Sequence, residues 1–226
     1  MAWILHEGDC LEVMRGMESE SVDAIITDPP YGIDYQSARR TDKSQWKPKI
    51  KNDTRPFIWW LYDGYRIVKD AGALVCFCRW DVQEVFKQAI EWAGFSVKSQ
   101  VVWDRGVHGM GDLEASFAPQ HDVIWFATKG KYVFPDMRPY SVIKSQRVNP
   151  EALLHPNEKP VDLLNYLIKS VVQKKGTVLD PFAGSGSTLC ASEQLKCNSI
   201  GIELDPKYCE IIRKRLSNMQ QTIFNL

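Results

Sequence analysis

The chain has 226 residues, of which 44% are apolar and 25% are charged, which is ordinary for a soluble globular domain. Its 28 basic residues equal its 28 acidic residues, so overall charge does not favour a polyanionic partner, and a nucleic-acid surface would need local positive charge. No apolar run reaches the ~18 residues that span a membrane, and the N-terminus lacks a secretion signal, so we expect one cytoplasmic domain, residues 1–226.

Strand-like and helix-like segments alternate along most of the chain. Helical spacing of apolar residues predicts helices over residues 57–69, 80–92, 161–172, 187–196 and 206–217. Stretches rich in β-branched and aromatic residues predict strands at 3–6, 22–27, 72–78, 96–103, 121–128, 177–180 and 199–204. This alternation predicts an α/β fold: a doubly wound, mostly parallel, seven-stranded sheet with helices on both faces.

Two segments interrupt the alternation, at residues 32–56 and 129–154. Long loops in a compact domain are usually functional or disordered. The first carries an excess of basic side chains over its three acids, namely Arg39, Arg40, Lys43, Lys47, Lys49, Lys51 and Arg55.

Six cysteines are scattered without a CxxC pair, which indicates reduced thiols and predicts neither a disulfide framework nor a metal site.

The stretch TDPPY, residues 27–31, leaves the second predicted strand through an acid and two prolines. Neither proline can donate to a sheet ladder, and each holds the residue before it in an extended conformation. Such a stiff turn suits either a binding site or a rigid strand end. In a sheet of parallel strands, ligands bind beyond the carboxyl ends, which is where this turn is expected.

A second turn with site character, DPFAGSGST at 180–188, follows the strand at 177–180. Gly184 and Gly186 allow backbone to approach a ligand closely, and the next helix offers free N–H groups. The segment does not match the dinucleotide-binding motif GxGxxG, because Leu189 occupies the position of the third glycine. Glu203, at the end of the next strand, is placed to accept hydrogen bonds from both hydroxyls of a ribose. The alternative is a tight turn with an incidental acid.

Four motifs together resemble the amino-group DNA methyltransferases, the N(4)/N(6) family that uses S-adenosylmethionine. They are DPPY at 28–31, HPNEKPVDLL at 155–164, DPFAGSGST at 180–188 and IELDP at 202–206. DPPY comes first and the glycine loop last, which is similar to the circularly permuted β order of that family. The resemblance extends from GDCLEVM at 8–14 to the last helix and implies a Rossmann-like methyltransferase fold.

The resemblance gives the first turn a catalytic role. An exocyclic base amine is a poor nucleophile because its lone pair is delocalised into the ring. The Asp28 carboxylate and the Pro29 carbonyl could accept its two hydrogens and return the lone pair to nitrogen, with Pro30 holding the turn rigid and Tyr31 stacking on the base. The amine is unreachable while paired, so the target base would be flipped out of the duplex.

The cofactor implied is S-adenosyl-L-methionine. Asp9 would accept from its adenine amino group, although Asp9 with Glu12 also reads as a helix capping box. Lys159 could meet its methionine carboxylate, or be a solvated lysine beside a loop histidine. Phe182 packs beside the cofactor or in the core. The expected cofactor-binding set is Asp9, Cys10, His155, Lys159, Asp180, Pro181, Phe182, Ala183, Gly184, Ser185, Gly186, Ser187, Thr188, Glu203 and Leu204.

Double-stranded DNA is the implied substrate. Arg39, Arg40, Lys43, Lys47, Lys49 and Lys51 would contact phosphates if the 32–56 loop closes over the flipped base, and otherwise form a solvated loop. Sequence discrimination would come from 104–120 and 129–154. The resemblance leaves open a homodimer and a cognate restriction endonuclease as partners, in a bacterial or phage-encoded, nucleoid-associated protein.

Adenine N(6) is the expected target because family members with Asp before PPY mostly act on adenine, with cytosine N(4) as the alternative. Methylation of RNA or of a protein amide is disfavoured, because those relatives carry the glycine loop before the PPY motif. A non-catalytic nucleotide- or DNA-binding module is disfavoured by the intact DPPY.

Overall fold

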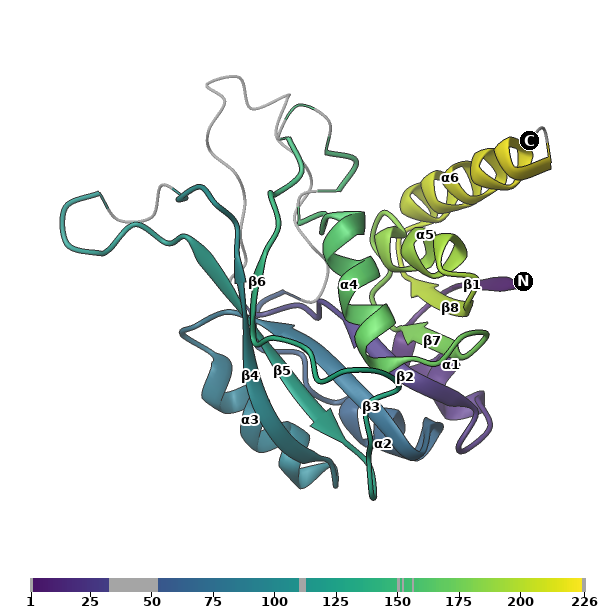
Figure 1. Cartoon of the computed structure of the whole chain (residues 1–226), viewed down its shortest axis with the longest axis horizontal. Helices are drawn as coiled ribbons and strands as arrows, with labels where there is room; N and C mark the ends of the chain where they lie inside the picture. Colours follow the sequence, from purple (N-terminus) through teal and green to yellow (C-terminus); the bar gives the residue numbers. More distant parts are fainter. Residues whose placement is uncertain are drawn as a thin grey trace.

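A computed structural model describes residues 2–32, 53–109, 113–149, 151, 153–155 and 157–224. Within these residues one sheet of eight strands has helices packed on it (Figure 1). The strands are β1 (Trp3–Glu7), β2 (Val22–Thr27), β3 (Val68–Cys78), β4 (Ser96–Asp104), β5 (His121–Thr128), β6 (Val142–Lys144), β7 (Thr177–Asp180) and β8 (Asn198–Glu203). The helices are α1 (Cys10–Gly16), α2 (Leu61–Ile67), α3 (Gln83–Trp92), α4 (Val161–Val171), α5 (Ser187–Gln194) and α6 (Pro206–Phe224).

The strand order is β1-β8-β7-β2-β3-β5-β4-β6, and β5 alone among the described strands runs antiparallel to its neighbours. From β7 the chain continues outward to β8, and from β2 it continues in the other direction to β3. The sheet therefore has its topological switch point between β7 and β2. In open α/β sheets the crevice at such a point, beyond the carboxyl ends, is where ligands bind.

The predicted doubly wound, mostly parallel architecture is confirmed, but the predicted count of seven strands is wrong. The described part of the sheet has eight, because β6 lies inside the segment predicted as the 129–154 loop. Residues of β6 pair with the carboxyl half of β4, and Ile143 is 7% exposed against the core. Only three residues form this strand, which is too short for a periodic pattern to reveal.

Two helices, α2 and α3, begin later than predicted because the residues predicted as their first turns make other contacts. Residues 57–60 do not join α2, since the Phe57 N–H donates to the Pro30 carbonyl at 3.0 Å. The helix ends at Ile67, where Val68 begins β3 by pairing with Val22. At α3 the predicted first turn is replaced by a bend in which Arg79 pairs with Asp81.

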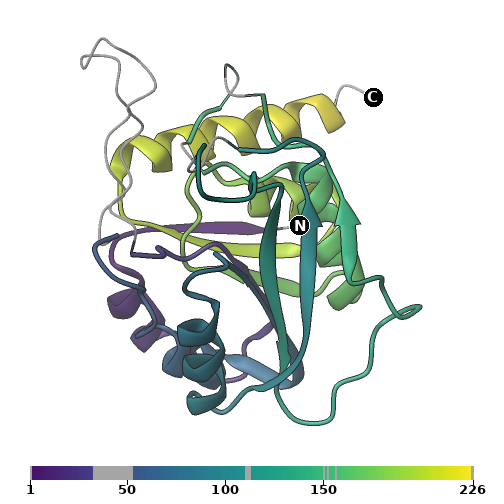
Figure 2. The same cartoon turned by 90° about the vertical axis from the view of Figure 1, so that its left-hand side faces the viewer.

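The core has a layer on each face of the sheet, as Figure 2 shows with the helices on its two sides. On one face Met14, Leu61 and Phe86 bring α1, α2 and α3 into a single cluster. On the other face Leu167 of α4 and Ala191 of α5 share a cluster with the sheet, and α6 packs on α5. All six cysteines are free and buried. None of the described helices has the length and apolar character needed to cross a bilayer.

A buried hydrogen bond joins the ends of β2 and β7. Because Ile25 is in register with Leu179, the next residues along both strands reach the same edge of the sheet. There the Thr27 hydroxyl donates to Asp180 Oδ1 at 2.7 Å, and both side chains are almost fully buried. This bond fixes the two turns that follow the strands relative to each other.

Replacing Thr27 by Val should destabilise the fold by roughly 1–3 kcal/mol, because it removes the hydroxyl donor and leaves a buried carboxyl oxygen with one partner fewer. Thr128→Val is a matched control. Thr128 is also 1% exposed, and its hydroxyl has no hydrogen-bond partner in the described structure. Urea denaturation of both variants measures the difference. Equal stabilities for the two variants would show that the Thr27 bond contributes nothing.

Candidate active site

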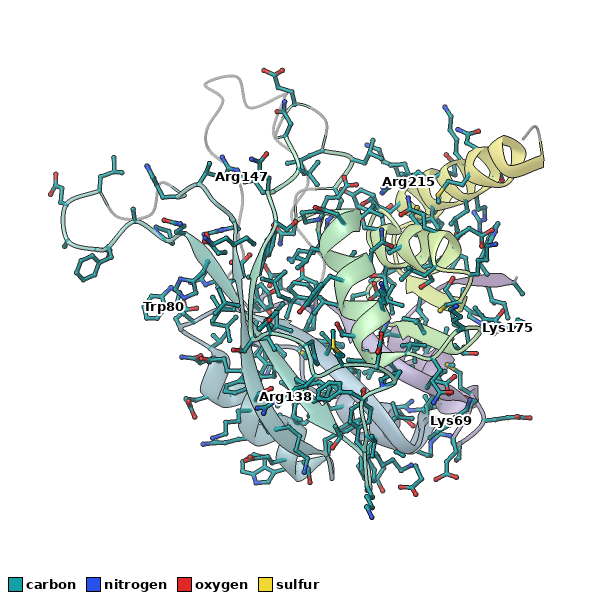
Figure 3. The ribbon with its side chains drawn as sticks, in the orientation of Figure 1. Lys69, Trp80, Arg138, Arg147, Lys175 and Arg215 are labelled. Carbon is teal, nitrogen blue, oxygen red and sulfur yellow. The ribbon has the colours of Figure 1, made fainter. Side chains whose placement is uncertain are left out.

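The two turns singled out in the sequence lie side by side at the switch point. Asp28, which follows β2, and Gly184, which follows β7, line the same cleft at the carboxyl edge of the sheet. Figure 3 shows Arg215 and Arg147 at this edge of the molecule and Lys69 and Lys175 at the opposite one. The topology thus brings together residues about 150 positions apart in the chain.

Asp28 is held by two donors. Lys159 forms an ion pair with its Oδ2, and the Tyr31 hydroxyl donates to its Oδ1. The side chains of Lys159 and Asp28 are only 12% and 17% exposed. Burial, followed by the Asp28 charge, holds the pKa of Tyr31 well above its usual value, so the tyrosine remains a donor.

The Tyr31 ring packs edge-on to Phe86, with centroids 6.2 Å apart, and the residue is 9% exposed. In this arrangement little of the ring faces solvent, and its predicted stacking on a base stays a prediction.

The two prolines of the turn differ in how their carbonyls are used. The Pro30 carbonyl accepts from the Phe57 N–H, which ties the turn to the segment before α2. Among the described residues, the Pro29 carbonyl has no hydrogen-bond partner. The turn therefore offers a carboxylate and a neighbouring backbone oxygen as acceptors, which is the pair the sequence predicted.

The glycine loop is anchored to the end of β8. Gly184 and Gly186 have φ values of +53° and +81°, in the left-handed region where glycine is favoured. The Gly184 N–H donates to Glu203 Oε2 at 2.8 Å, and the Ala183 N–H donates to the Ile202 carbonyl at 2.9 Å. At Gly186, the N-cap of α5, no side chain caps the helix, so its first N–H groups face the loop without a side-chain acceptor.

A buried acid, Asp180, and a partly buried acid, Glu203, support this loop. Burial raises the pKa of Asp180 to about 6, although hydrogen bonds from Thr188, Thr27 and the Phe182 N–H partly oppose that rise. Burial also raises the pKa of Glu203, opposed by backbone hydrogen bonds from Asp205, Gly184 and Leu204.

His155, Asn157, Glu158 and Lys159 of the HPNEKP motif line the cleft beside the loop. The His155 ring lies against Tyr208 with centroids 4.6 Å apart, and a Cβ on Gly184 would lie 3.5 Å from that ring. Glu158 accepts from Arg215 at 2.9 Å and from the Leu154 N–H at 2.8 Å. Arg215 also donates to the Ser185 carbonyl at 2.8 Å, so α6 clamps the segment to the glycine loop.

Sequence reasoning missed Glu158, Arg215 and Phe77. Glu158 belongs to the HPNEKP motif, and its position between His155 and Lys159 could have predicted that it also lies at the site. Arg215 is one of several cations on a long amphipathic helix, and nothing in the sequence distinguishes it. Phe77 lies under Lys159, with the ammonium 5.0 Å from the ring centroid, but reads in the sequence as an ordinary core residue.

The remaining predicted residues divide into two groups. Asp28, His155, Lys159, Asp180, Phe182, Ala183, Gly184, Ser185, Ser187 and Thr188 line the cleft. Pro29, Pro30, Tyr31, Asp9, Cys10, Pro181, Gly186, Glu203 and Leu204 are not in its lining.

Asp9 acts as the N-cap of α1, accepting from the Leu11 N–H at 2.8 Å, so the capping interpretation holds. The Gly8 N–H donates to the Glu203 carbonyl at 2.9 Å, so Asp9 and Cys10 follow β1, which is two strands away from β7 in the sheet. Their contact with adenine stays a prediction. Phe182 both lines the cleft and packs edge-on against Phe57 and Trp60.

The predicted DNA contacts Arg39, Arg40, Lys43, Lys47, Lys49 and Lys51 lie outside the described residues. Within the described part of the chain, no group of three or more His, Cys, Asp or Glu residues could hold a metal ion.

Comparison with known proteins supplies the assignment. The family model of DNA methylases that act at N6 or N4 matches residues 22–214. The chain belongs to this DNA methylase family. It is a methyltransferase, and S-adenosylmethionine is the methyl donor of the family.

Named relatives match nearly the whole chain. YubD of Escherichia coli (strain K12), which carries the name of a methylase, is 32% identical over 222 residues, covering 96% of this chain and 91% of YubD. The M1.HpyAVI–SAM complex covers 95% of this chain and 100% of its own, with a TM-score of 0.74 and 24% identity. The cytosine-N4-specific PvuII DNA methyltransferase covers 92% and 84%, with a TM-score of 0.74 and 16% identity. At these identities the two structures support the fold.

The cleft residues of this methyltransferase suit that donor. The glycine loop brings backbone close to the cleft, and Glu203, which lies outside the lining, holds the loop through the Gly184 N–H, while its predicted contact with ribose hydroxyls stays a prediction. Asp28, Glu158 and Asp180 make the lining acidic, which suits a sulfonium cation. Lys159 is the single lysine or arginine among the lining residues.

Asp180 gives a pH-dependent prediction. Its pKa is about 6 when folded and ~3.9 when unfolded, so the folded state binds the proton more tightly. Wild-type stability from this group is therefore fully present below pH ~4 and lost as the pH rises through about 6.

Asp180→Asn cannot ionise, so the wild type should lose stability relative to it between pH ~4 and ~7, by on the order of 3 kcal/mol at most. Urea denaturation of both proteins across this range measures the difference. Parallel pH profiles would contradict the buried, easily protonated carboxyl.

Proposed function

We propose that this protein transfers the methyl group of S-adenosylmethionine to N(6) of an adenine flipped out of double-stranded DNA. The observation that supports it most directly is the position of the DPPY turn. Asp28 lines the cleft that the glycine loop forms, and the next residue, Pro29, has a backbone carbonyl without a hydrogen-bond partner among the described residues. An amine with two hydrogens needs two such acceptors in fixed positions.

The chain's part in the reaction is mainly orientation. Asp28 and Pro29 accept the two amine hydrogens and direct the nitrogen lone pair toward the cleft. The donor, when bound, supplies a methyl group on a sulfonium, and in-line attack then depends on the two reactants being held close and aligned. Tyr31, kept protonated, fixes the rotation of the Asp28 carboxylate through its hydrogen bond.

A duplex would approach from the carboxyl edge. Because β4 runs parallel to β3 within the sheet and β6 runs parallel to β4, the segments after β4 and β6 leave at the same edge as Asp28. Exposed Lys144 and Arg147 lie there, and Phe117 is fully exposed in the segment after β4. These segments fall within the two regions from which sequence discrimination was predicted.

Adenine is favoured over cytosine by the Asp in DPPY. Cytosine N(4) is the second candidate, and the fold shared with the cytosine-N4-specific PvuII enzyme supports it, since both chemistries present an exocyclic amine to the same pair of acceptors. Cytoplasmic localisation, a homodimer, a partner endonuclease and a single domain over 1–226 stay predictions.

Single-molecule sequencing of plasmid DNA from cells that express the protein should show one modified base type, N(6)-methyladenine, in one sequence context. N(4)-methylcytosine in its place would establish the second candidate. Unmodified plasmid from cells that accumulate folded protein would contradict the proposal.

Asp28→Asn should lower the rate of methyl transfer at least ~100-fold, because the neutral amide is a weaker acceptor for an amine that gains positive charge. Binding of S-adenosylhomocysteine should not weaken. Asp70→Asn, which changes an exposed acid of β3 at the opposite edge, is the matched control and should keep wild-type activity. Turnover by Asp28→Asn near the wild-type rate would remove Asp28 from its role.

A further inference from the structure

The ion pair between Lys159 and Asp28 joins two parts of the cleft that have different proposed roles. Asp28 belongs to the turn that would accept the target amine, and Lys159 belongs to the HPNEKP motif, which lines the cleft beside the glycine loop. Both side chains are less than one-fifth exposed. Breaking a pair this buried by removing one partner leaves an uncompensated charge, which is strongly destabilising. Lys159 is therefore more stable beside an anion than without one.

Other acids of the cleft do not offer that anion in the described structure. Glu158 is already paired with Arg215, and Asp180 points its Oδ1 to Thr27 and the Phe182 N–H. A new anion in the cleft would have to come from a ligand. S-adenosylmethionine carries one, the carboxylate of its amino-acid part, and Lys159 is the strongly basic residue that lines the described cleft.

The same ion pair is unfavourable for the proposed reaction. Tyr31 donates to one oxygen of Asp28 and Lys159 to the other, so each oxygen already accepts one internal hydrogen bond. A carboxylate neutralised by an ammonium is also a weaker acceptor for an amine hydrogen. Asp28 is thus better prepared for the target amine once Lys159 has moved away.

We propose that Lys159 changes partner, from Asp28 to the carboxylate of the methyl donor, and so couples donor binding to release of the amine acceptor. The inference rests on the proposed function. It gives a physical reason for the donor to bind before the target base, since the donor supplies the anion that frees Asp28. Phe77 supports the exchange, because the ammonium already lies over its ring and a cation can shift across an aromatic face without losing that contact.

The exchange can be measured without DNA. S-adenosylhomocysteine carries the carboxylate, and 5′-methylthioadenosine lacks the whole amino-acid part. Isothermal titration calorimetry of both ligands with wild type, Asp28→Asn, Lys159→Met and the double variant forms a double-mutant cycle. If Asp28 competes for Lys159, Asp28→Asn should bind S-adenosylhomocysteine roughly tenfold more tightly, as expected for a coupling of this kind.

The increase in affinity caused by Asp28→Asn should be absent for 5′-methylthioadenosine. It should also disappear when Lys159 is replaced by Met. Asp81→Asn, which removes a different ion pair, with Arg79, is the matched control and should bind both ligands as wild type does. The double variant removes both charges together, so if Lys159→Met alone fails to fold, comparison of the double variant with Asp28→Asn still shows whether the tighter binding depends on the Lys159 ammonium.

Two outcomes would overturn the exchange. Unchanged or weaker S-adenosylhomocysteine binding by Asp28→Asn would mean that Lys159 stays on Asp28 when the ligand is present. A gain that persists in the double variant relative to Lys159→Met would mean direct repulsion between Asp28 and the ligand. Failure of the wild type to bind either ligand would instead refute the donor itself, and with it the proposed function.

Discussion

The parallel pairing of β2 with β7 is the constraint on which the site depends. It places the carboxyl ends of two strands next to each other at the switch point of the sheet, and the Thr27–Asp180 hydrogen bond closes that junction. Each strand then contributes a turn of a different kind. The DPPY turn is stiff and presents acceptors, whereas the glycine loop is tight and presents donors. The cleft between them therefore has hydrogen-bond acceptors on one side and hydrogen-bond donors on the other.

The charged groups of the cleft differ in how deeply they are buried and in how their charge is compensated. Asp180 is almost fully buried, and burial raises its pKa to about 6, so it braces the junction with little charge below that pH. Glu158 is neutralised by Arg215, which also holds the loop through the Ser185 carbonyl. Asp28 and Lys159 are the pair left facing one another across the opening, where a ligand with charges of both signs can change their partners.

Much of this arrangement could be predicted from the sequence, for a simple reason. Alternating strands and helices imply a parallel sheet, and a parallel sheet sends the ends of its strands to one edge. That rule places Asp28 and Gly184 at one edge of the sheet, and the pairing of β2 with β7 then makes them neighbours. The position of Pro29, and the acceptor pair it forms with Asp28, are local properties of the tetrapeptide.

The remainder depended on contacts that no local pattern encodes. Lys159 and Asp28 are 131 residues apart, and their pairing depends on where the HPNEKP motif lies along the cleft. Arg215 is selected from several cations of α6 by the helix's final orientation. Residues 57–60 do not form the first turn of the helix predicted at 57–69, because the Phe57 N–H donates to the Pro30 carbonyl. The short strand β6 formed because β4 had a free edge. In each case tertiary contact overrode a weak local preference.

The edge strand β1 is paired with β8, and the DPPY strand β2 with β7, so early and late parts of the chain complete each other. During synthesis on the ribosome, the first two strands must wait for residues 177–203 before they gain these neighbours. Contacts between such distant segments make folding slow, because a long loop must close before they form. No nascent fragment that stops short of β8 can hold a finished site, so the activity can appear only after residues 198–203 have been synthesised.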